Sequence, residues 1–121
     1  ILVTDDSKMA RKMVIKILND VLNENVEVFE GQNGQEAFDL YKEHLPEIVF
    51  LDLTMPVMNG FEALSKIKEF DKNAKVVIIS EEIQKLSMDK ALQLGAFNFI
   101  KKPIDLEKMQ QILGKINELD K

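Results

Sequence analysis

The chain has 121 residues, of which 45% are hydrophobic and 31% are charged, and it contains no cysteine. Such a chain can bury a core without disulfides, and thiolate catalysis and cysteine-bound zinc are excluded. The formal net charge of -5 argues against direct contact with nucleic acid. The short apolar runs argue against membrane insertion. No signal peptide pattern opens the chain, so we expect a cytoplasmic location.

Short apolar runs alternate with longer amphipathic stretches along the whole chain. The runs cover residues 1–3, 26–29, 48–51, 76–79 and 97–100, and three of them are nearly continuous and rich in Val and Ile. This composition predicts parallel strands that are covered on both faces. Between the runs, apolar residues recur at three- and four-residue spacing, which predicts helices around residues 10–21, 37–41, 61–67, 83–94 and 106–119.

This alternation predicts an α/β fold in which residues 1–121 form one domain. Gly and Pro residues fall between the elements, and Asp105 is a candidate N-cap for the last helix. Five strands are too few for a closed barrel, which needs about eight. We therefore expect a doubly wound parallel sheet of the flavodoxin-like (βα)5 type, with strand order 2-1-3-4-5.

Three acidic residues follow two of the predicted strands. Asp5 and Asp6 end the first strand, and Asp52 ends the third. In open α/β sheets, ligands bind beyond the carboxyl ends of the strands near the switch in strand order, which here lies between strands one and three. Like charges held this close need a counter-cation, and oxygen ligands favour a hard ion. The sequence therefore predicts a Mg²⁺ site.

Two further polar residues end the remaining strands at the same edge. Ser80 follows the fourth strand, and Lys102 follows the fifth. A hydroxyl and an ammonium group facing carboxylates are suited to bind the oxygens of a phosphoryl group. Taken alone, each residue also fits a plainer interpretation as a helix cap, a turn residue or a solvated lysine. Because all of them fall at strand ends, we expect Asp52 to accept a phosphoryl group.

The chain resembles the response-regulator receiver domain of two-component signalling over essentially its whole length. The stretches that carry this resemblance are VTDDS at residues 3–7, FLDLTMPVMNG at 50–60, IIS at 78–80, and Gly95-Ala96 leading to Lys102-Pro103. Their order and spacing are more specific than any one of them. The chain looks most similar to the stand-alone members of the chemotaxis type.

The resemblance implies roles for the residues around the acidic pocket. Asp52 matches the phosphorylated aspartate, and Asp6 matches the acid that binds the metal directly. Asp5 matches the neighbouring acid, which usually reaches the ion through water. Thr54 matches the position whose backbone carbonyl completes the metal site. The implied activity is phosphotransfer from a histidine kinase to this chain, followed by autodephosphorylation. Because the chain would catalyse only these reactions on itself, we do not expect it to be an enzyme that acts on another substrate.

The resemblance also implies a switch between the pocket and an output surface. Ser80 matches the switch hydroxyl, Lys102 matches the family's lysine, and Phe99 matches the switch aromatic. The bond between Lys102 and Pro103 is expected to be cis, and Lys101 is expected to point away from Lys102. The output surface implied is the fourth helix, fifth strand and fifth helix, which would bind a downstream protein or domain and which includes Lys85, Lys90, Phe99 and Lys108.

One departure from the family pattern follows the switch hydroxyl. The next residue is usually small, but here it is Glu81, followed by Glu82. An acid beside a phosphoryl group should repel it, so we expect slower phosphotransfer or a Glu81 side chain turned to solvent; both residues are candidate modulators.

Two alternatives remain open at this point. One is a receiver-like interaction module that is never phosphorylated. The other is a phosphatase with an aspartyl nucleophile, although Thr54 stands where such enzymes carry a second Asp.

Overall fold

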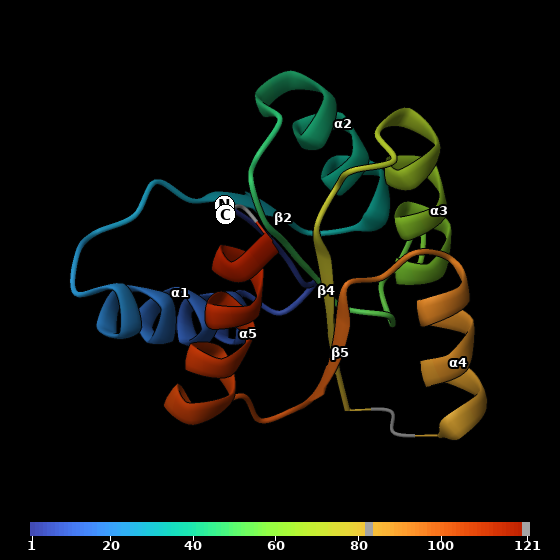
Figure 1. Cartoon of the computed structure of the whole chain (residues 1–121). Coiled ribbons are helices and arrows are strands. Elements are labelled where there is room, and N and C mark those ends of the chain that lie inside the picture. Colours follow the sequence, from blue (N-terminus) through green and yellow to red (C-terminus); the bar gives the residue numbers. More distant parts are fainter. Residues whose placement is uncertain (82–83, 120–121) are drawn as a thin grey trace.

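The computed structural model describes residues 1–81 and 84–119, and in these ranges five parallel strands alternate with five helices (Figure 1). The strands are β1 (Leu2–Thr4), β2 (Phe29–Gly31), β3 (Val49–Leu51), β4 (Val76–Ser80) and β5 (Asn98–Lys101). The helices are α1 (Lys8–Leu22), α2 (Gly34–His44), α3 (Gly60–Phe70), α4 (Lys85–Gln93) and α5 (Leu106–Leu119). The sheet order is β2-β1-β3-β4-β5, so the predicted topology is confirmed.

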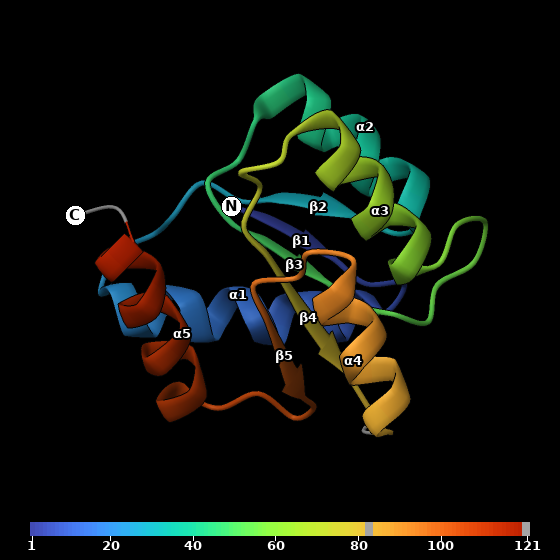
Figure 2. The same ribbon diagram turned by 45° about the vertical axis from the view of Figure 1, so that its right-hand side comes forward.

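The helices cover the two faces of the sheet in two apolar layers. Figure 2 shows α1 and α5 on one face and α2, α3 and α4 on the other. Successive strand residues point to opposite layers, as the two-residue period of a strand requires. On β3, for example, Val49 and Leu51 join the layer beneath α2 and α3, while Phe50 joins the layer beneath α1 and α5. No helix in the described ranges is long and apolar enough to cross a membrane.

The second strand lies later in the chain than predicted. It begins at Phe29 rather than at Val26, because its pairing with β1 runs from Leu2 opposite Phe29 to Thr4 opposite Gly31. Val26 and Val28 precede the strand and pack against the apolar layer of α1 and α5. Their apolar character therefore reflects burial in a connection and not membership of the strand.

Helix starts are fixed by capping side chains close to the carboxyl ends of the strands. Ser7, Asn33 and Asn59 each accept a hydrogen bond from a backbone N–H group of the first turn of α1, α2 or α3. Asp105 Oδ1 accepts from the N–H group of Lys108 at 2.8 Å, as predicted for α5. These caps place the first turns of α1 and α3 beside the ends of β1 and β3.

Helix α4 is held more weakly than its apolar pattern predicts. Ala91 is its one fully buried residue, and Leu86, which was expected on the buried face, is 81% exposed. Gln84 at its N-cap makes no side-chain capping bond. Ile83, the first member of the predicted stripe, lies outside the described residues. Met13 of α1 is also half exposed, although its spacing predicted a core position.

Candidate functional site

Three carboxylates converge where β1 and β3 end side by side. Asp5, Asp6 and Asp52 each offer an oxygen atom, and these atoms lie within 4.8 Å of one another. Asp5 and Asp52 are buried, with exposed fractions of 6% and 7%, while Asp6 is exposed. The predicted convergence is therefore confirmed. The pocket that contains them has a volume of about 300 Å³ and is lined by Asp5, Asp6, Ser7, Asp52, Thr54, Ser80, Glu81 and Lys102.

Asp52 is held in place by a backbone hydrogen bond to β1 and by the loop that follows it. Its N–H group donates to the carbonyl oxygen of Thr4 at 3.1 Å, which extends the pairing of β1 with β3. Gly60 donates its N–H to the carbonyl oxygen of Leu53 at 2.9 Å. A Cβ atom at Gly60 would collide with the carbonyl group of Asp52, so the loop closes this tightly only because residue 60 is glycine.

Asp5 is fixed by hydrogen bonds to its backbone and to both carboxylate oxygens. Its N–H group donates to the carbonyl oxygen of Gly31 at 3.1 Å. Oδ1 accepts from the N–H group of Ser7 at 2.9 Å, and Oδ2 accepts from Lys102 Nζ at 2.7 Å. Its carboxylate therefore has little freedom to turn.

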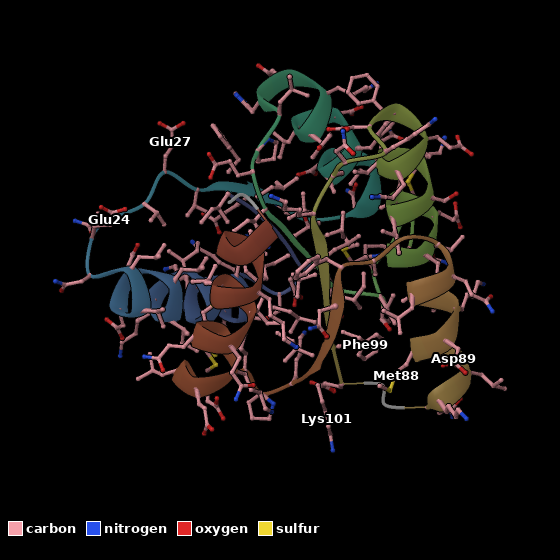
Figure 3. All side chains as sticks on the ribbon, in the orientation of Figure 1. Glu24, Glu27, Met88, Asp89, Phe99 and Lys101 are labelled. Atoms are coloured by element: carbon pink, nitrogen blue, oxygen red, sulfur yellow. The ribbon has the colours of Figure 1, made fainter. Side chains whose placement is uncertain are left out.

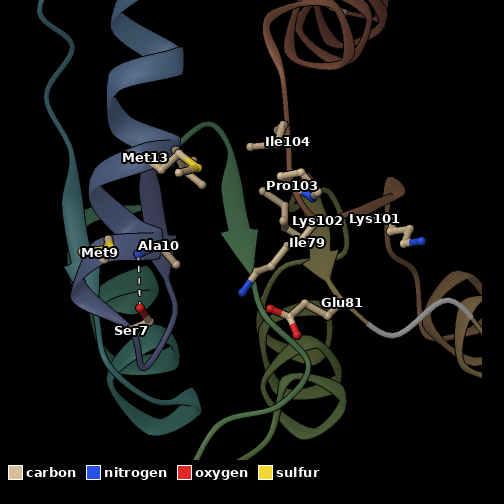
Figure 4. A pocket seen from close by; sticks show the side chains of 11 residues that line it. Ser7, Met9, Ala10, Met13, Ile79, Glu81, Lys101, Lys102, Pro103 and Ile104 are labelled. Carbon is tan, nitrogen blue, oxygen red and sulfur yellow. Dashed lines mark hydrogen bonds between the residues drawn. The ribbon is translucent and has the colours of Figure 1, made fainter.

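Lys102 enters the pocket from the end of β5. Its N–H group donates to the carbonyl oxygen of Ser80 at 2.8 Å, and its peptide bond to Pro103 is cis, as the resemblance implied. Its Nζ lies 3.7 Å from Asp52 Oδ2 as well as 2.7 Å from Asp5 Oδ2. Lys101 is exposed and points away from Lys102 (Figure 4). The expectation that the two lysines face opposite ways is confirmed.

Burial and the neighbouring charges shift the pKa values of two groups in the pocket. Burial raises the pKa of Asp52 to about 6; the positive charge of Lys102 opposes this shift, and the negative charge of Asp5 adds to it. Burial would lower the pKa of Lys102, but its hydrogen bond to Asp5 and the charges of Asp52, Asp5 and Glu81 raise it instead. Burial is thus the main reason that Asp52 holds a proton more readily than a free carboxyl group, and the ammonium group of Lys102 stays protonated.

A second and larger cavity adjoins the acidic pocket. It has a volume of about 600 Å³, lies between α1 and the segment after β5, and is lined mostly by apolar side chains. Ser7, Glu81 and Lys102 line both cavities. Figure 4 shows the Glu81 carboxylate and the Lys102 ammonium group directed toward each other. Glu81 is exposed to solvent and also lines the pocket, so its carboxylate is accessible to water without leaving the site.

The two switch residues lie in different surroundings. Ser80 is buried, with an exposed fraction of 2%, and lines the acidic pocket. Phe99 is half buried, packs against the apolar layer of α2 and α3, and is directed from β5 toward α4 (Figure 3). Thr54 is exposed at the rim of the pocket. Glu82, the second candidate modulator, lies outside the described residues.

The donor atoms at this site suit a hard divalent cation. Three carboxylates supply only oxygen ligands, and Asp6 and Thr54 leave the site open at its rim. Lys102 supplies the single ammonium group among the lining residues, so it offsets only part of the negative charge of the three Asp carboxylates and Glu81. The residues present therefore fit a metal ion of the Mg²⁺ type.

Arg11 is a residue of this region that the sequence interpretation missed. It lies on α1, is only 6% exposed, and donates through Nη1 to the carbonyl oxygen of Asp5 at 2.7 Å. A signal was present, because Arg11, Val14 and Leu18 recur at helical spacing and therefore share the buried face of α1. An arginine on such a face needs buried acceptors, and those lie at the pocket.

Comparison with known proteins agrees with this geometry. The sequence model of the response regulator receiver domain matches residues 1–114. The chemotaxis protein CheY of Bacillus subtilis is 38% identical over 115 residues, covering 95% of this chain and 94% of CheY. CheY of Treponema pallidum is 42% identical over 119 residues, covering 96% of this chain and 81% of that protein.

Known structures give the same result. The crystal structure of the CheX–CheY–BeF3–Mg²⁺ complex from Borrelia burgdorferi contains a chain that superposes with a TM-score of 0.87 at 38% identity, covering 96% of this chain and 87% of that one. The response regulator domain of Thermotoga maritima CheB gives 0.79 at 31% identity, covering 97% and 92%. This chain therefore belongs to the family of response regulator receiver domains and is similar to CheY.

Proposed function

We propose that a partner histidine kinase phosphorylates this chain on Asp52, with Mg²⁺ bound by Asp5, Asp6, Asp52 and the backbone carbonyl of Thr54. The observation that carries this proposal is the convergence of the three carboxylates within 4.8 Å, with Lys102 Nζ 3.7 Å from Asp52 Oδ2. A nucleophile, a site for a cation and a donor for the incoming group thus share one pocket.

The reaction transfers one phosphoryl group without a separate substrate site. A carboxylate oxygen of Asp52 attacks phosphorus, an O–P bond forms, and the P–N bond to the donor imidazole breaks. The electron pair of that bond stays on the imidazole nitrogen, which then takes up a proton. Mg²⁺ held by the acidic residues would supply positive charge to the carboxylates and to the phosphoryl oxygens. Lys102 and Ser80 donate to the phosphoryl oxygens, and the loop closed at Gly60 keeps Asp52 in position.

Phosphorylation would change the surface formed by α4, β5 and α5. Ser80 ends β4 in the pocket, and Phe99 lies on the adjacent strand β5 beside α4. Helix α4 buries a single residue fully, so its position costs little to change. A shift of Ser80 toward the phosphoryl group would let Phe99 turn inward and α4 move with it. A downstream protein or domain would read this surface.

Relatives support this assignment of ligands. The Borrelia burgdorferi structure named above combines CheY with BeF3 and Mg²⁺, together with CheX. The residues to which we assign binding of Mg²⁺ and of the phosphoryl group line the acidic pocket of this chain. A phosphatase is less well supported, because the position two residues after Asp52 is Thr54 and no carboxylate there can act as acid or base.

The proposal is tested by incubating the protein with Mg²⁺ and acetyl phosphate and measuring phosphoryl incorporation. The parent should incorporate phosphate only with Mg²⁺, and Asp52→Asn should incorporate none. A parent that folds normally but incorporates none would favour the alternative of a module that is never phosphorylated. Release of inorganic phosphate from Asp52→Asn would instead point to a phosphatase with a different nucleophile.

A further inference from the structure

Arg11 is a buried cation that the proposed reaction does not use. Its Nη1 donates to the carbonyl oxygen of Asp5 at 2.7 Å, and its Nε donates to Glu30 Oε1 at 3.0 Å. The Arg11 side chain is 8% exposed, whereas that of Glu30 is 43% exposed. The bond to Asp5 is thus the better shielded of the two and is the stronger constraint.

The carbonyl that Arg11 holds belongs to the peptide unit between Asp5 and Asp6. A peptide unit is planar, so fixing the oxygen of Asp5 also fixes the N–H group of Asp6. The directions in which both side chains leave the backbone are therefore constrained by one donor. Asp5 has further bonds of its own from Ser7 and Lys102.

Asp6 depends on this constraint more than Asp5 does. In the ranges that the structure describes, no side-chain hydrogen bond or ion pair holds the Asp6 carboxylate, and Asp6 is exposed. Its carboxylate stays within reach of Asp5 and Asp52 because the backbone aims it there. A rotated peptide plane would carry this carboxylate away from the other two.

We infer that Arg11 is a positioning residue for the metal site, because it clamps the peptide plane that aims Asp6 and Asp5 at Asp52. This inference rests on the proposed function, since it concerns how the same site binds Mg²⁺. Arg11 touches neither the ion nor the phosphoryl group. Residues that orient metal ligands typically affect metal affinity about 10- to 100-fold when they are changed.

The test measures Mg²⁺ affinity by titration calorimetry in Arg11→Met, Arg11→Lys and Glu30→Gln, with stability followed by urea unfolding. Arg11→Met should weaken Mg²⁺ binding about tenfold. Glu30→Gln removes the charge partner of Arg11 but leaves the bond to the Asp5 carbonyl, so it should keep the parent affinity. Arg11→Lys keeps a charged donor and should recover part of the loss.

A second readout separates positioning from stability. Rotation of the peptide plane should shift the amide resonance of Asp6 in Arg11→Met, before any Mg²⁺ is added, more than in Glu30→Gln. Ile67→Val serves as a control that loosens the opposite apolar layer and should leave Mg²⁺ affinity unchanged. If Arg11→Met does not fold, Arg11→Gln, which is too short to reach the carbonyl, takes its place.

The outcomes distinguish this inference from the proposed function. Parent-like Mg²⁺ affinity in a folded Arg11→Met or Arg11→Gln protein, while the parent is phosphorylated, would overturn the positioning role and leave the function standing. Equal weakening in Glu30→Gln would also overturn it, because the ion pair and not the carbonyl clamp would then matter. A parent that binds no Mg²⁺ would overturn both.

Discussion

Lys102 Nζ donates a 2.7 Å hydrogen bond to Asp5 Oδ2, although the two residues are 97 positions apart in the chain. The same ammonium group lies 3.7 Å from Asp52 Oδ2, so it is engaged by Asp5 more closely than by the proposed phosphoacceptor. The pocket is therefore closed by a link between the segment that follows β1 and the segment that follows β5. A phosphoryl group on Asp52 would compete with Asp5 for this lysine.

Replacing Lys102 should separate metal binding from phosphotransfer. Lys102→Met removes a cation that already neutralises Asp5, so Mg²⁺ should bind more tightly to the three carboxylates. The same change removes a donor to the transferred group, so phosphorylation should slow about 100-fold. Mg²⁺ titration and the rate of phosphoryl incorporation from acetyl phosphate measure the two effects. Lys101→Met is the control, because it removes the same charge from an exposed neighbour. It should change the Mg²⁺ affinity and the phosphorylation rate less than Lys102→Met does.

Glu81 should slow phosphorylation because its charge stands beside the approach to Asp52. Glu81 lines both cavities, and its charge contributes to the raised pKa of Lys102. A unit charge near a solvent-exposed site is worth about 1 kcal/mol, so Glu81→Ala should speed phosphorylation about fivefold. Glu24→Ala, on the loop before β2 far from the pocket (Figure 3), should leave the rate unchanged. A Glu81→Ala rate no faster than that of the parent would refute this role.

Val57 should be replaceable with a gain in stability. It lies in the loop between β3 and α3 with φ of 67°, a left-handed conformation that is unfavourable for a β-branched residue, and it is 82% exposed. Val57→Asn should raise the free energy of unfolding by about 1 kcal/mol, because Asn tolerates this backbone and no core packing is lost. Val57→Ala removes the β-branch but has no polar side chain that can hydrogen-bond locally in this backbone conformation, so it should gain less. Urea unfolding would contradict this account if the Asn variant were no more stable than the Ala variant.

The hydrogen bond between Tyr41 and Asp71 should stabilise the fold at neutral pH and lose this effect at acidic pH. Tyr41 donates to Asp71 Oδ2 at 2.7 Å, and this bond, together with one from the N–H group of Asn73, lowers the pKa of Asp71. Because the folded-state pKa lies below the unfolded value, the contribution is complete above about pH 4 and is lost as the pH falls further.

Removing the Tyr41 hydroxyl measures this contribution. Tyr41→Phe should cost about 1 kcal/mol of unfolding free energy at neutral pH and less at pH values where Asp71 is protonated. Asp71→Asn keeps an acceptor without the charge, so its stability should depend less on pH. An equal cost of Tyr41→Phe at neutral and at acidic pH would contradict the lowered pKa.

The sheet and the acidic pocket could be predicted because both follow from local pattern. Apolar runs and breakers set the order of the elements, and residues that end parallel strands must meet at one edge. Asp5, Asp52, Ser80 and Lys102 therefore came together as expected. The predicted position of β2 was wrong, because pairing with β1, and not apolar character, decides where this strand begins.

Other features depend on contacts that no local pattern specifies. The bond from Lys102 to Asp5, the clamp of Arg11 on the Asp5 carbonyl and the exposure of Leu86 all depend on how distant elements pack. The place of Glu81 between two cavities is of the same kind. Sequence indicated that Glu81 matters but could not indicate that it remains directed toward Lys102.

Locating the phosphoryl group on the chain shows directly whether Asp52 is the acceptor. The protein is incubated with Mg²⁺ and acetyl phosphate, the acyl phosphate is reduced with borohydride, and the peptides are analysed by mass spectrometry. Homoserine is expected in place of Asp52, only when Mg²⁺ and acetyl phosphate were both present, and in no other peptide. Reduction at Asp5 or Asp6, or an unmodified Asp52 peptide from a folded protein that binds Mg²⁺, would contradict this assignment.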